Sequence, residues 1–342
     1  MQPRIVSRIL FALTLFIAGL AGSQTAFAAD KPAVVNFAYI NGPRPWILGK
    51  ADGSFDKALG TKVVWHNFKS GVPVINALAA GEIDIARVGS VPAVSALTRK
   101  LPITVIAVSG VLGESEALIA KDTVKNIKDL EGKAVGVPQG TTAHYALLAA
   151  LKGGNVDISR VRQVQLAPSD MFAPWKRGDI EAAYTWAPYT GQLLENGGHT
   201  LITTKDIRKF DTYIFNVFVV RNDFAARHPE LVTAFLKNFQ VNVDTLKADP
   251  KAAAAIIAKE LEQDAAASEA VLAAIEFPSI KDQLEPAWLG NGGDSTAKSV
   301  VVKSLRDTAE FLSGQGAIKE ADIPASFAPF INPEFLAKAL AQ

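Results

Sequence analysis

The sequence contains no cysteine. This absence excludes disulfide bonds, thiol catalysis and thiolate metal sites, and also a lipid anchor on an N-terminal cysteine. The chain has 342 residues, of which 49% are hydrophobic, so an apolar core can hold it without covalent bridges. Its length favours two domains.

Concentrated charge and catalytic motifs are also missing. The formal net charge is +1 and no block of like charges occurs, which argues against nucleic acid as a partner. There is no G-x-S-x-G elbow, P-loop or G-x-G-x-x-G fingerprint, and the four histidines do not stand in zinc-ligand spacing. We therefore predict no catalytic residues, no metal site and no cofactor.

The first 28 residues have the pattern of a secretory signal peptide. Arg4 and Arg8 form a basic start, an apolar stretch covers 9–20, and Ala-Phe-Ala at 26–28 fits a small-x-small cleavage site. The apolar stretch is short for a membrane span, and polar residues follow it. We predict cleavage after Ala28 and a location in the bacterial periplasm.

Residues 134–151 have the pattern of a strand, a tight turn and a helix. The turn carries glycine and the pair Thr141 and Thr142 where the helix N-cap is expected. The first N–H groups of a helix lack intrahelical partners and carry a partial positive charge, so this turn could bind a small anion. His144 could also donate to that anion. Threonine also caps helices that bind nothing, and a lone helical histidine is more often a packed residue.

Two blocks of the chain share a short pattern. Residues 81–92 and 178–188 both read Gly-acid-Ile-acid-x-Ala, and in each a proline then opens a helix. We interpret the blocks as the same strand-to-helix step, used once in each of two lobes. The acids alternate along each strand, so we expect them to face solvent.

Strands alternate with helices along the chain, which predicts an α/β fold of mostly parallel, doubly wound sheets with helices on both faces. Ligands of such sheets bind beyond the carboxyl ends of the strands. A crossing segment is expected at 116–121, and a long strand at 213–221 offers a way back. The expected organisation is lobe 1 over 29–115 and 222–342, and lobe 2 over 116–221, with a cleft between them.

Four segments resemble the periplasmic substrate-binding proteins of taurine and alkanesulfonate ABC importers, within the wider nitrate, sulfonate and taurine group. They are residues 89–92, 115–118, 141–145 and 175–188, and the last of them is a fairly specific motif. The resemblance is closest to the taurine branch and weakens toward the C-terminal end. It implies a type II periplasmic binding protein fold, whose two lobes grip a ligand and deliver it to an inner-membrane permease.

The resemblance also implies a ligand and its site. A sulfonate is a permanent anion with three oxygens, so it needs hydrogen-bond donors rather than a base. Helix N-termini of both lobes would supply donors, and Trp186 would cover the apolar part of the ligand. The expected ligand-binding residues are Asn41, Arg44, Ser90, Glu114, Gln139, Thr141, Thr142, Trp186 and Asn216.

This chain departs from the taurine branch at one position. Asn216 stands where that branch usually carries an aspartate that suits the ligand's ammonium group, and Glu114 is a candidate replacement. A sulfonate without an amine, or a larger one stacked on Trp46, therefore stays open beside taurine.

Other ligands and one other class of function also stay open on this fold. Nitrate, an aromatic carboxylate or sulfonate, and a pyrimidine precursor are alternative ligands, and an enzyme is a minor alternative. As partners we expect the small anion and the permease, with no nucleic acid, and we expect a monomeric protein.

Overall fold

The computed structural model describes residues 31–341. The predicted signal peptide and its cleavage site lie outside these residues. Within the described part, no helix is long and apolar enough to cross a bilayer. The chain from Pro32 onward forms one compact unit, which contains two β-sheets.

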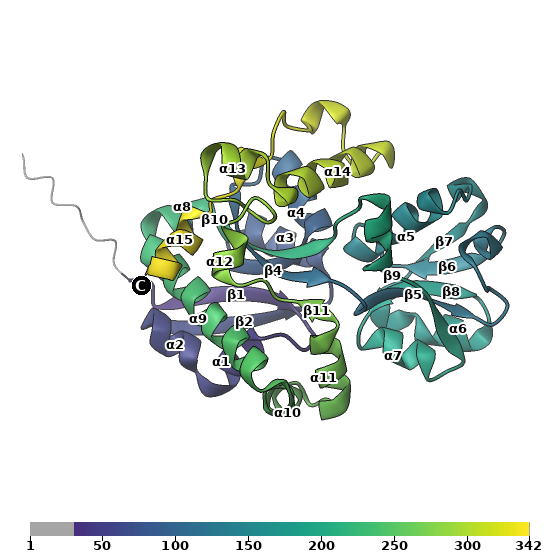
Figure 1. Cartoon of the computed structure of the whole chain (residues 1–342), viewed down its shortest axis with the longest axis horizontal. Helices are drawn as coiled ribbons and strands as arrows, with labels where there is room; N and C mark the ends of the chain where they lie inside the picture. The colour runs from purple at the N-terminus through teal and green to yellow at the C-terminus, as the bar shows by residue number, and fades with distance from the viewer. Residues whose placement is uncertain (1–30, 342) are drawn as a thin grey trace, which may run out of the picture. The chain divides into compact units, whose positions relative to one another are not determined.

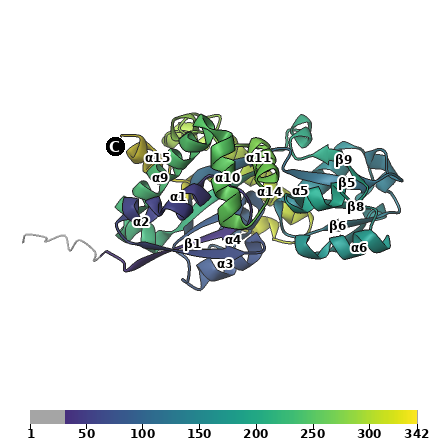
Figure 2. The same ribbon diagram turned by 90° about the horizontal axis from the view of Figure 1, so that it is seen from below.

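The first sheet, with the helices that cover it, is called lobe 1. Its six strands have the order β11-β4-β10-β3-β1-β2, in which β1, β2 and β3 are parallel and β10 runs antiparallel between β3 and β4. Helices α1, α2, α9 and α10 lie on one side of β1, and α3 and α4 lie on the other (Figures 1 and 2). The strands are β1 (Val34–Ile40), β2 (Lys62–Phe68), β3 (Ile85–Gly89), β4 (Ile103–Leu112), β10 (Phe215–Arg221) and β11 (Ile275–Glu276).

The second sheet, with its own helices, is called lobe 2. Its five strands have the order β7-β6-β8-β5-β9, in which β6, β7 and β8 are parallel and β5 runs antiparallel between β8 and β9. The strands are β5 (Glu116–Lys121), β6 (Ala134–Val137), β7 (Arg162–Gln165), β8 (Ala182–Trp186) and β9 (Gly198–Thr203).

The helices follow the same division. Those of lobe 2 are α5 (Thr142–Gly153), α6 (Phe172–Arg177) and α7 (Tyr189–Leu194). Those of lobe 1 are α1 (Trp46–Asp52), α2 (Ser54–Leu59), α3 (Gly71–Ala79), α4 (Ser90–Thr98), α8 (Asn222–Arg227), α9 (Pro229–Ala248), α10 (Pro250–Leu261), α11 (Ala265–Ala273), α12 (Ile280–Gln283), α13 (Gly293–Ala297), α14 (Val300–Gly314) and α15 (Glu334–Ala341).

The two sheets repeat one topology. The strand order β2-β1-β3-β10-β4 of lobe 1 corresponds to β7-β6-β8-β5-β9 of lobe 2, and the fourth strand of each series runs against the other four. That fourth strand is the first one formed after the chain has crossed from the other lobe. The predicted α/β architecture of two doubly wound lobes with two crossing segments is therefore confirmed.

The expected lobe boundary after residue 221 is wrong. β10 pairs with β3 and β4, so the chain is back in lobe 1 by Phe215. The physical reason is burial on both faces, since every residue of β10 from Phe215 to Val220 is buried. A strand that is apolar on both faces is stable only between two other strands with helices on either side.

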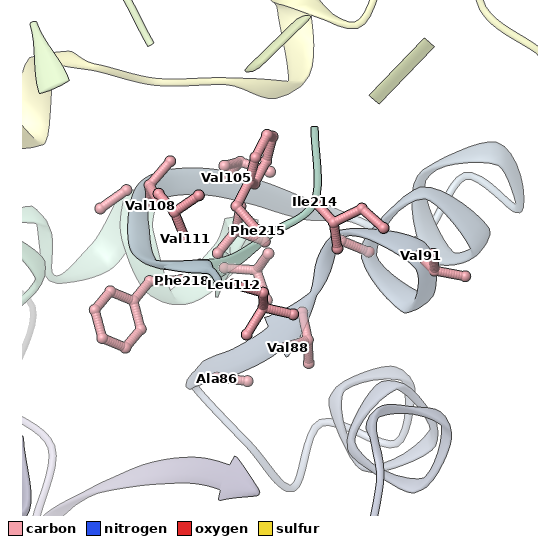
Figure 3. Close-up of a cluster of buried hydrophobic side chains, with 14 of the residues drawn as sticks. Ala86, Val88, Val91, Val105, Val108, Val111, Leu112, Ile214, Phe215 and Phe218 are labelled. Carbon is pink, nitrogen blue, oxygen red and sulfur yellow. The ribbon is translucent and has the colours of Figure 1, made fainter. Parts of the chain in front are cut away.

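The centre of lobe 1 is a layer of apolar side chains from β3, β4 and β10. Val88, Val108 and Phe218 have no exposed surface, and Figure 3 shows them beside the side chains that follow along the same strands. This packing holds the carboxyl end of β3 in place, from which α4 starts. The helix begins at Ser90, before the proline that was expected to open it, because Pro92 lies in the first turn, where proline is tolerated.

The expectation that the repeated acids face solvent is wrong for the second acid of each block. The backbone N–H of Asn36 donates to Asp84 at 2.8 Å, and that of Ala134 donates to Glu181 at 3.0 Å. Each acid returns the bond, because its own N–H donates to the carbonyl of the same partner. The blocks are therefore one structural device used twice, a carboxylate that holds the start of the neighbouring interior strand, β1 or β6.

Asp84 also has a cationic partner in Arg221, with 3.3 Å between the guanidinium nitrogen and a carboxylate oxygen. Replacing Asp84 by alanine would leave the Asn36 N–H, which is partly buried, without its acceptor, whereas Arg221 would keep its ion pair with Asp223 and its bond to the carbonyl of Ile83. We predict that Asp84→Ala lowers the free energy of unfolding by about 1 to 3 kcal/mol, the cost of a buried donor without an acceptor, measured by urea denaturation. The exposed Glu82→Ala is the matched control and should stay within about 0.5 kcal/mol of wild type. Equal losses in the two variants would contradict this role of Asp84.

Candidate functional site

A cavity lies between the two lobes, at the carboxyl ends of the parallel strands of both sheets. Its space, including the open mouth, is about 450 Å³. β1, β3 and β8 end at it, as the rule for doubly wound sheets predicts. The lining residues are Ile40, Asn41, Arg44, Gly71, Arg87, Gly89, Pro92, Leu112, Glu116, Thr141, Thr142, Trp186 and Asn216.

Three helices, α3, α4 and α5, point their N-termini at this cavity. Gly71 is the first residue of α3, Gly89 is the N-cap of α4, and Thr141 is the N-cap of α5. The three ends are close to one another. A Cβ atom on Gly71 would lie 2.5 Å from a carbon of Pro92, and one on Gly89 would lie 2.8 Å from a carbon of Thr142. A side chain at either position would clash with the neighbouring helix, so both residues must be glycine. The partial positive charges of the three helix N-termini therefore meet in one space.

Two buried guanidinium groups add full charges to the same space. Arg44 precedes α1 and donates to the carbonyl of Pro43 at 2.6 Å, while Arg87 lies on β3. Burial lowers the pKa of Arg44 to about 10, and burial together with the nearby Arg44 charge lowers the pKa of Arg87. The Nε of Arg87 has no hydrogen-bond partner within the described residues.

One buried carboxylate, Glu116, faces these two arginines from lobe 2. Its oxygens accept the hydroxyl of Thr142 at 2.7 Å and the hydroxyl of Thr204 at 3.0 Å. Burial raises the pKa of Glu116 to about 7, although the hydroxyl donors and both arginines act against this rise. The cavity therefore combines two cations and three helix N-termini with a single weak acid.

Glu116 and Asn216 occupy equivalent places in the two lobes. Each lies at the start of the returning antiparallel strand, where Glu116 pairs with Trp186 of β8 and Asn216 pairs with Gly89 of β3. Both side chains line the cavity. The repeated topology thus places a carboxyl group on the lobe 2 side and an amide on the lobe 1 side.

Six of the nine residues predicted from the sequence line the cavity, namely Asn41, Arg44, Thr141, Thr142, Trp186 and Asn216. Ser90 lies directly after Gly89, and its buried hydroxyl has no hydrogen-bond partner within residues 31–341. The hydroxyls of the two threonines are already engaged. Thr141 donates to the carbonyl of Pro138, and Thr142 donates to Glu116. The donors that the start of α5 can offer are its first backbone N–H groups.

The remaining predicted residues lie elsewhere. Glu114 is exposed and pairs with Lys205 at 3.1 Å, and Gln139 is exposed next to Gln165. Trp46 cannot stack on a ligand, because it is fully buried against Phe37 and Phe218 in the core of lobe 1. These placements correct the expectation that Glu114 and Gln139 bind the ligand, and they argue against the alternative of a larger sulfonate stacked on Trp46.

His144 lies outside the cavity lining as well. Its Nε2 is 2.9 Å from the side-chain oxygen of Gln163, and its ring lies against Phe311 of α14. Of the two readings left open for this histidine, the structure therefore favours a packed residue over an anion donor.

The prediction from the sequence missed Arg87 and Glu116. A signal for each was present, since Arg87 is the only charge in the apolar run 85–89 and Glu116 opens the apolar run 116–120. A charge inside a strand that is buried on both faces must be paired or face a polar cavity. Using this signal requires knowing that β3 and β5 lie inside their sheets, between two other strands, which depends on the pairing of distant segments.

Comparison with known proteins identifies the family. Residues 33–271 match the family model of the substrate-binding domain of ABC-type glycine betaine transport systems. The chain belongs to this family of substrate-binding proteins. A curated relative, the taurine-binding periplasmic protein of Escherichia coli, is 40% identical over 215 residues, which cover 62% of this chain and 67% of the relative. The family resemblance seen in the sequence motifs is thus confirmed.

Solved structures show the same fold. This substrate-binding protein matches the alkanesulfonate-binding protein of Xanthomonas axonopodis pv. citri bound to MOPS, with a TM-score of 0.72, 18% identity, and coverage of 89% of this chain and 99% of the other. It also matches the desulfurization enzyme DSZB, with a TM-score of 0.62, 15% identity, and coverage of 91% and 99%. The fold alone therefore hosts both binding proteins and an enzyme.

The raised pKa of Glu116 makes the stability of the ligand-free protein depend on pH. The folded state keeps its proton up to about pH 7, whereas the unfolded carboxyl group has an ordinary pKa of 4.5. The stabilisation is therefore complete below pH 4.5 and is lost as the pH rises to 7, a loss of about 3 kcal/mol. We predict that Glu116→Gln removes this loss.

The measurement is urea unfolding of the ligand-free protein and the variant at several values between pH 4.5 and pH 8. The stability of Glu116→Gln relative to wild type should rise along this series, whereas the exposed Glu114→Gln should follow wild type. Parallel curves for wild type and Glu116→Gln would show that Glu116 is not the titrating group.

Proposed function

We propose that this protein captures a small organosulfonate, taurine or a close relative, in the cavity between its lobes and delivers it to an ABC permease of the inner membrane. It acts as a periplasmic monomer and leaves its ligand chemically unchanged. The observation that carries the proposal is the convergence of two buried guanidiniums and three helix N-termini on one cavity. Its close relative is a taurine-binding periplasmic protein, which supports the same ligand class.

A sulfonate matches these donors for a physical reason. Its charge is permanent and is spread over three oxygens, so it can accept hydrogen bonds from several directions without exchanging a proton. Hydrogen bonds from guanidinium groups and helix N-termini to such an anion are about twice as strong as neutral ones. Binding would also remove the repulsion between Arg44 and Arg87, because an anion between them compensates both charges.

The apolar part of the lining limits the organic part of the ligand. Ile40, Pro92 and Leu112 of lobe 1 and the half-buried Trp186 of lobe 2 form this part. They cover a short aliphatic chain next to the anion site and leave no indole of the first loop to stack on a large aromatic ring, since Trp46 is in the core. We therefore favour a short alkyl sulfonate over the aromatic alternatives.

Calorimetric titration of the purified protein with taurine, ethanesulfonate, an aromatic sulfonate, sulfate and nitrate tests the proposal. We expect the short sulfonates to bind more tightly than both inorganic anions, because only they fill the apolar lining. Trp186→Ala should weaken the short sulfonates and leave sulfate and nitrate unchanged. Absence of binding by every sulfonate at millimolar concentration would refute the proposed function, and consumption of a bound ligand, followed by NMR, would favour the enzyme alternative.

Arg87 gives a second test, because an unpaired buried cation has opposite effects on binding and on stability. We predict that Arg87→Met, which keeps most of the volume, weakens sulfonate binding by about 10- to 100-fold through the loss of a charged hydrogen bond. The same change should raise the melting temperature of the ligand-free protein, because a desolvated charge is removed. Arg177→Met, at the exposed arginine that ends α6, is the control and should change neither quantity much. Unchanged sulfonate affinity in Arg87→Met would exclude Arg87 from the site.

A further inference from the structure

We propose that Glu116 selects the charge of the ligand's organic end, so that its carboxylate receives the ammonium group of a zwitterionic aminosulfonate. A sulfonate without an amine would bind only together with a proton on the same carboxyl group. This inference rests on the proposed capture of a sulfonate, and it assigns to one residue the choice between two classes of sulfonate.

The hydrogen bonds of Glu116 leave room for a cation. A carboxylate offers about four lone-pair positions, and only two of them are used, by the hydroxyls of Thr142 and Thr204. Thr204 in turn lies 3.1 Å from the hydroxyl of Tyr184, which can donate to it, so this chain of hydroxyls is complete without the ligand. Within the described residues, Glu116 forms no ion pair with a lysine or arginine. A buried ionised carboxylate needs such a partner, and the ligand can supply it.

Three titratable groups face Glu116 from the elements around it. Arg44, before α1, and Arg87, on β3, favour its ionised form from a distance, and Tyr184, on β8, is a neutral phenol whose pKa is raised well above its ordinary value by burial and by Glu116. The two arginines are the expected partners of the sulfonate. Once the sulfonate compensates them, their support for an ionised Glu116 is lost, and the carboxyl group must gain either an ammonium partner or a proton.

The surroundings of Glu116 suit an ammonium group. Trp186 is its cross-strand partner on β8 and also lines the cavity, so a cation beside the carboxylate can also contact an aromatic ring. The equivalent place in lobe 1 holds Asn216, which is neutral. Of these two equivalent positions, only Glu116 on β5 can therefore carry a negative charge, whereas Asn216 on β10 cannot. This asymmetry gives the ligand a direction, with the amine toward β5 and β8 and the sulfonate toward the N-termini of α3 and α4.

The test compares taurine with ethanesulfonate, which share the sulfonate and the two-carbon chain and differ in the amine. Affinities are measured by calorimetry between pH 6 and pH 8, in buffers of low and high ionisation enthalpy. Burial brings the pKa of Glu116 to about 7, so the protonated fraction falls about tenfold over this interval. Ethanesulfonate should weaken by about tenfold and take up a proton at pH 8, whereas taurine should strengthen toward pH 8 and take up none.

Two variants isolate the carboxylate. Glu116→Gln keeps the shape and removes the charge, so we expect taurine to bind about 10- to 100-fold more weakly and ethanesulfonate to bind equally well at pH 6 and pH 8. Glu114→Gln makes the same change two residues away at an exposed position, and it should behave as wild type. Retained binding of ethanesulfonate shows that Glu116→Gln is folded and that its sulfonate site is intact.

The outcomes separate this inference from the function on which it rests. If neither sulfonate binds the wild-type protein, the proposed function fails. If both bind but with the same pH dependence, or if Glu116→Gln retains full taurine affinity, sulfonate capture stands and the role of Glu116 is overturned. Loss of taurine binding in Glu114→Gln alone would move the amine site to that residue.

Discussion

The unequal burial of charge at the carboxyl ends of the strands is the constraint around which this protein is built. Arg44 and Arg87 are buried and form no ion pair with a carboxylate of residues 31–341, and the N-termini of α3, α4 and α5 point at the same space. Glu116 compensates only part of this positive charge. Such an arrangement costs free energy in the ligand-free protein, because each ion loses its water without gaining a full partner. An anionic ligand pairs with these cations and offsets their desolvation cost, and this gain in free energy favours binding.

The core of each lobe makes this cost tolerable. The central strands of lobe 1 are apolar on both faces, and their side chains have almost no exposed surface. A carboxylate bound to a backbone N–H secures the start of an interior strand in both lobes, Asp84 for β1 and Glu181 for β6. The site is therefore placed on rigid sheet edges and helix starts. This reduces the conformational entropy that a ligand must remove when it binds.

Much of the fold could be predicted from the sequence. The stretch 134–151 became β6, a turn and α5, and its N-cap is the predicted threonine, because capping and strand-to-helix turns are decided by neighbours in the chain. The repeated blocks at 81–92 and 178–188 became equivalent strands for the same local reason. The lobe boundary and the exposure of Asp84 were wrong, since both depend on which distant strand lies beside β10 or β3.

The candidate site was predicted less completely. Six of its residues follow from helix starts, from the first loop and from family motifs, which are all visible along the chain. Glu114 and Gln139 were misplaced because a difference of a few residues turns a side chain from a cavity to solvent. Arg87 and Glu116 were missed because a charged residue is recognised as part of a site only when its strand is known to be buried. Burial of a strand depends on the whole sheet and its covering helices.

The sequence by itself therefore determined the α/β class, the alternation of strands and helices, and the helix starts that favour an anion, all through interactions between near neighbours. Only the tertiary structure decided which charges share the cavity. Arg44 and Arg87 come from lobe 1 and Glu116 comes from lobe 2, and these side chains meet because two sheets, assembled from distant segments, present the ends of their strands to each other. The interaction between these charges depends on their distance in space and on the low dielectric constant of the buried site. Neither quantity can be inferred from the order of the residues in the chain.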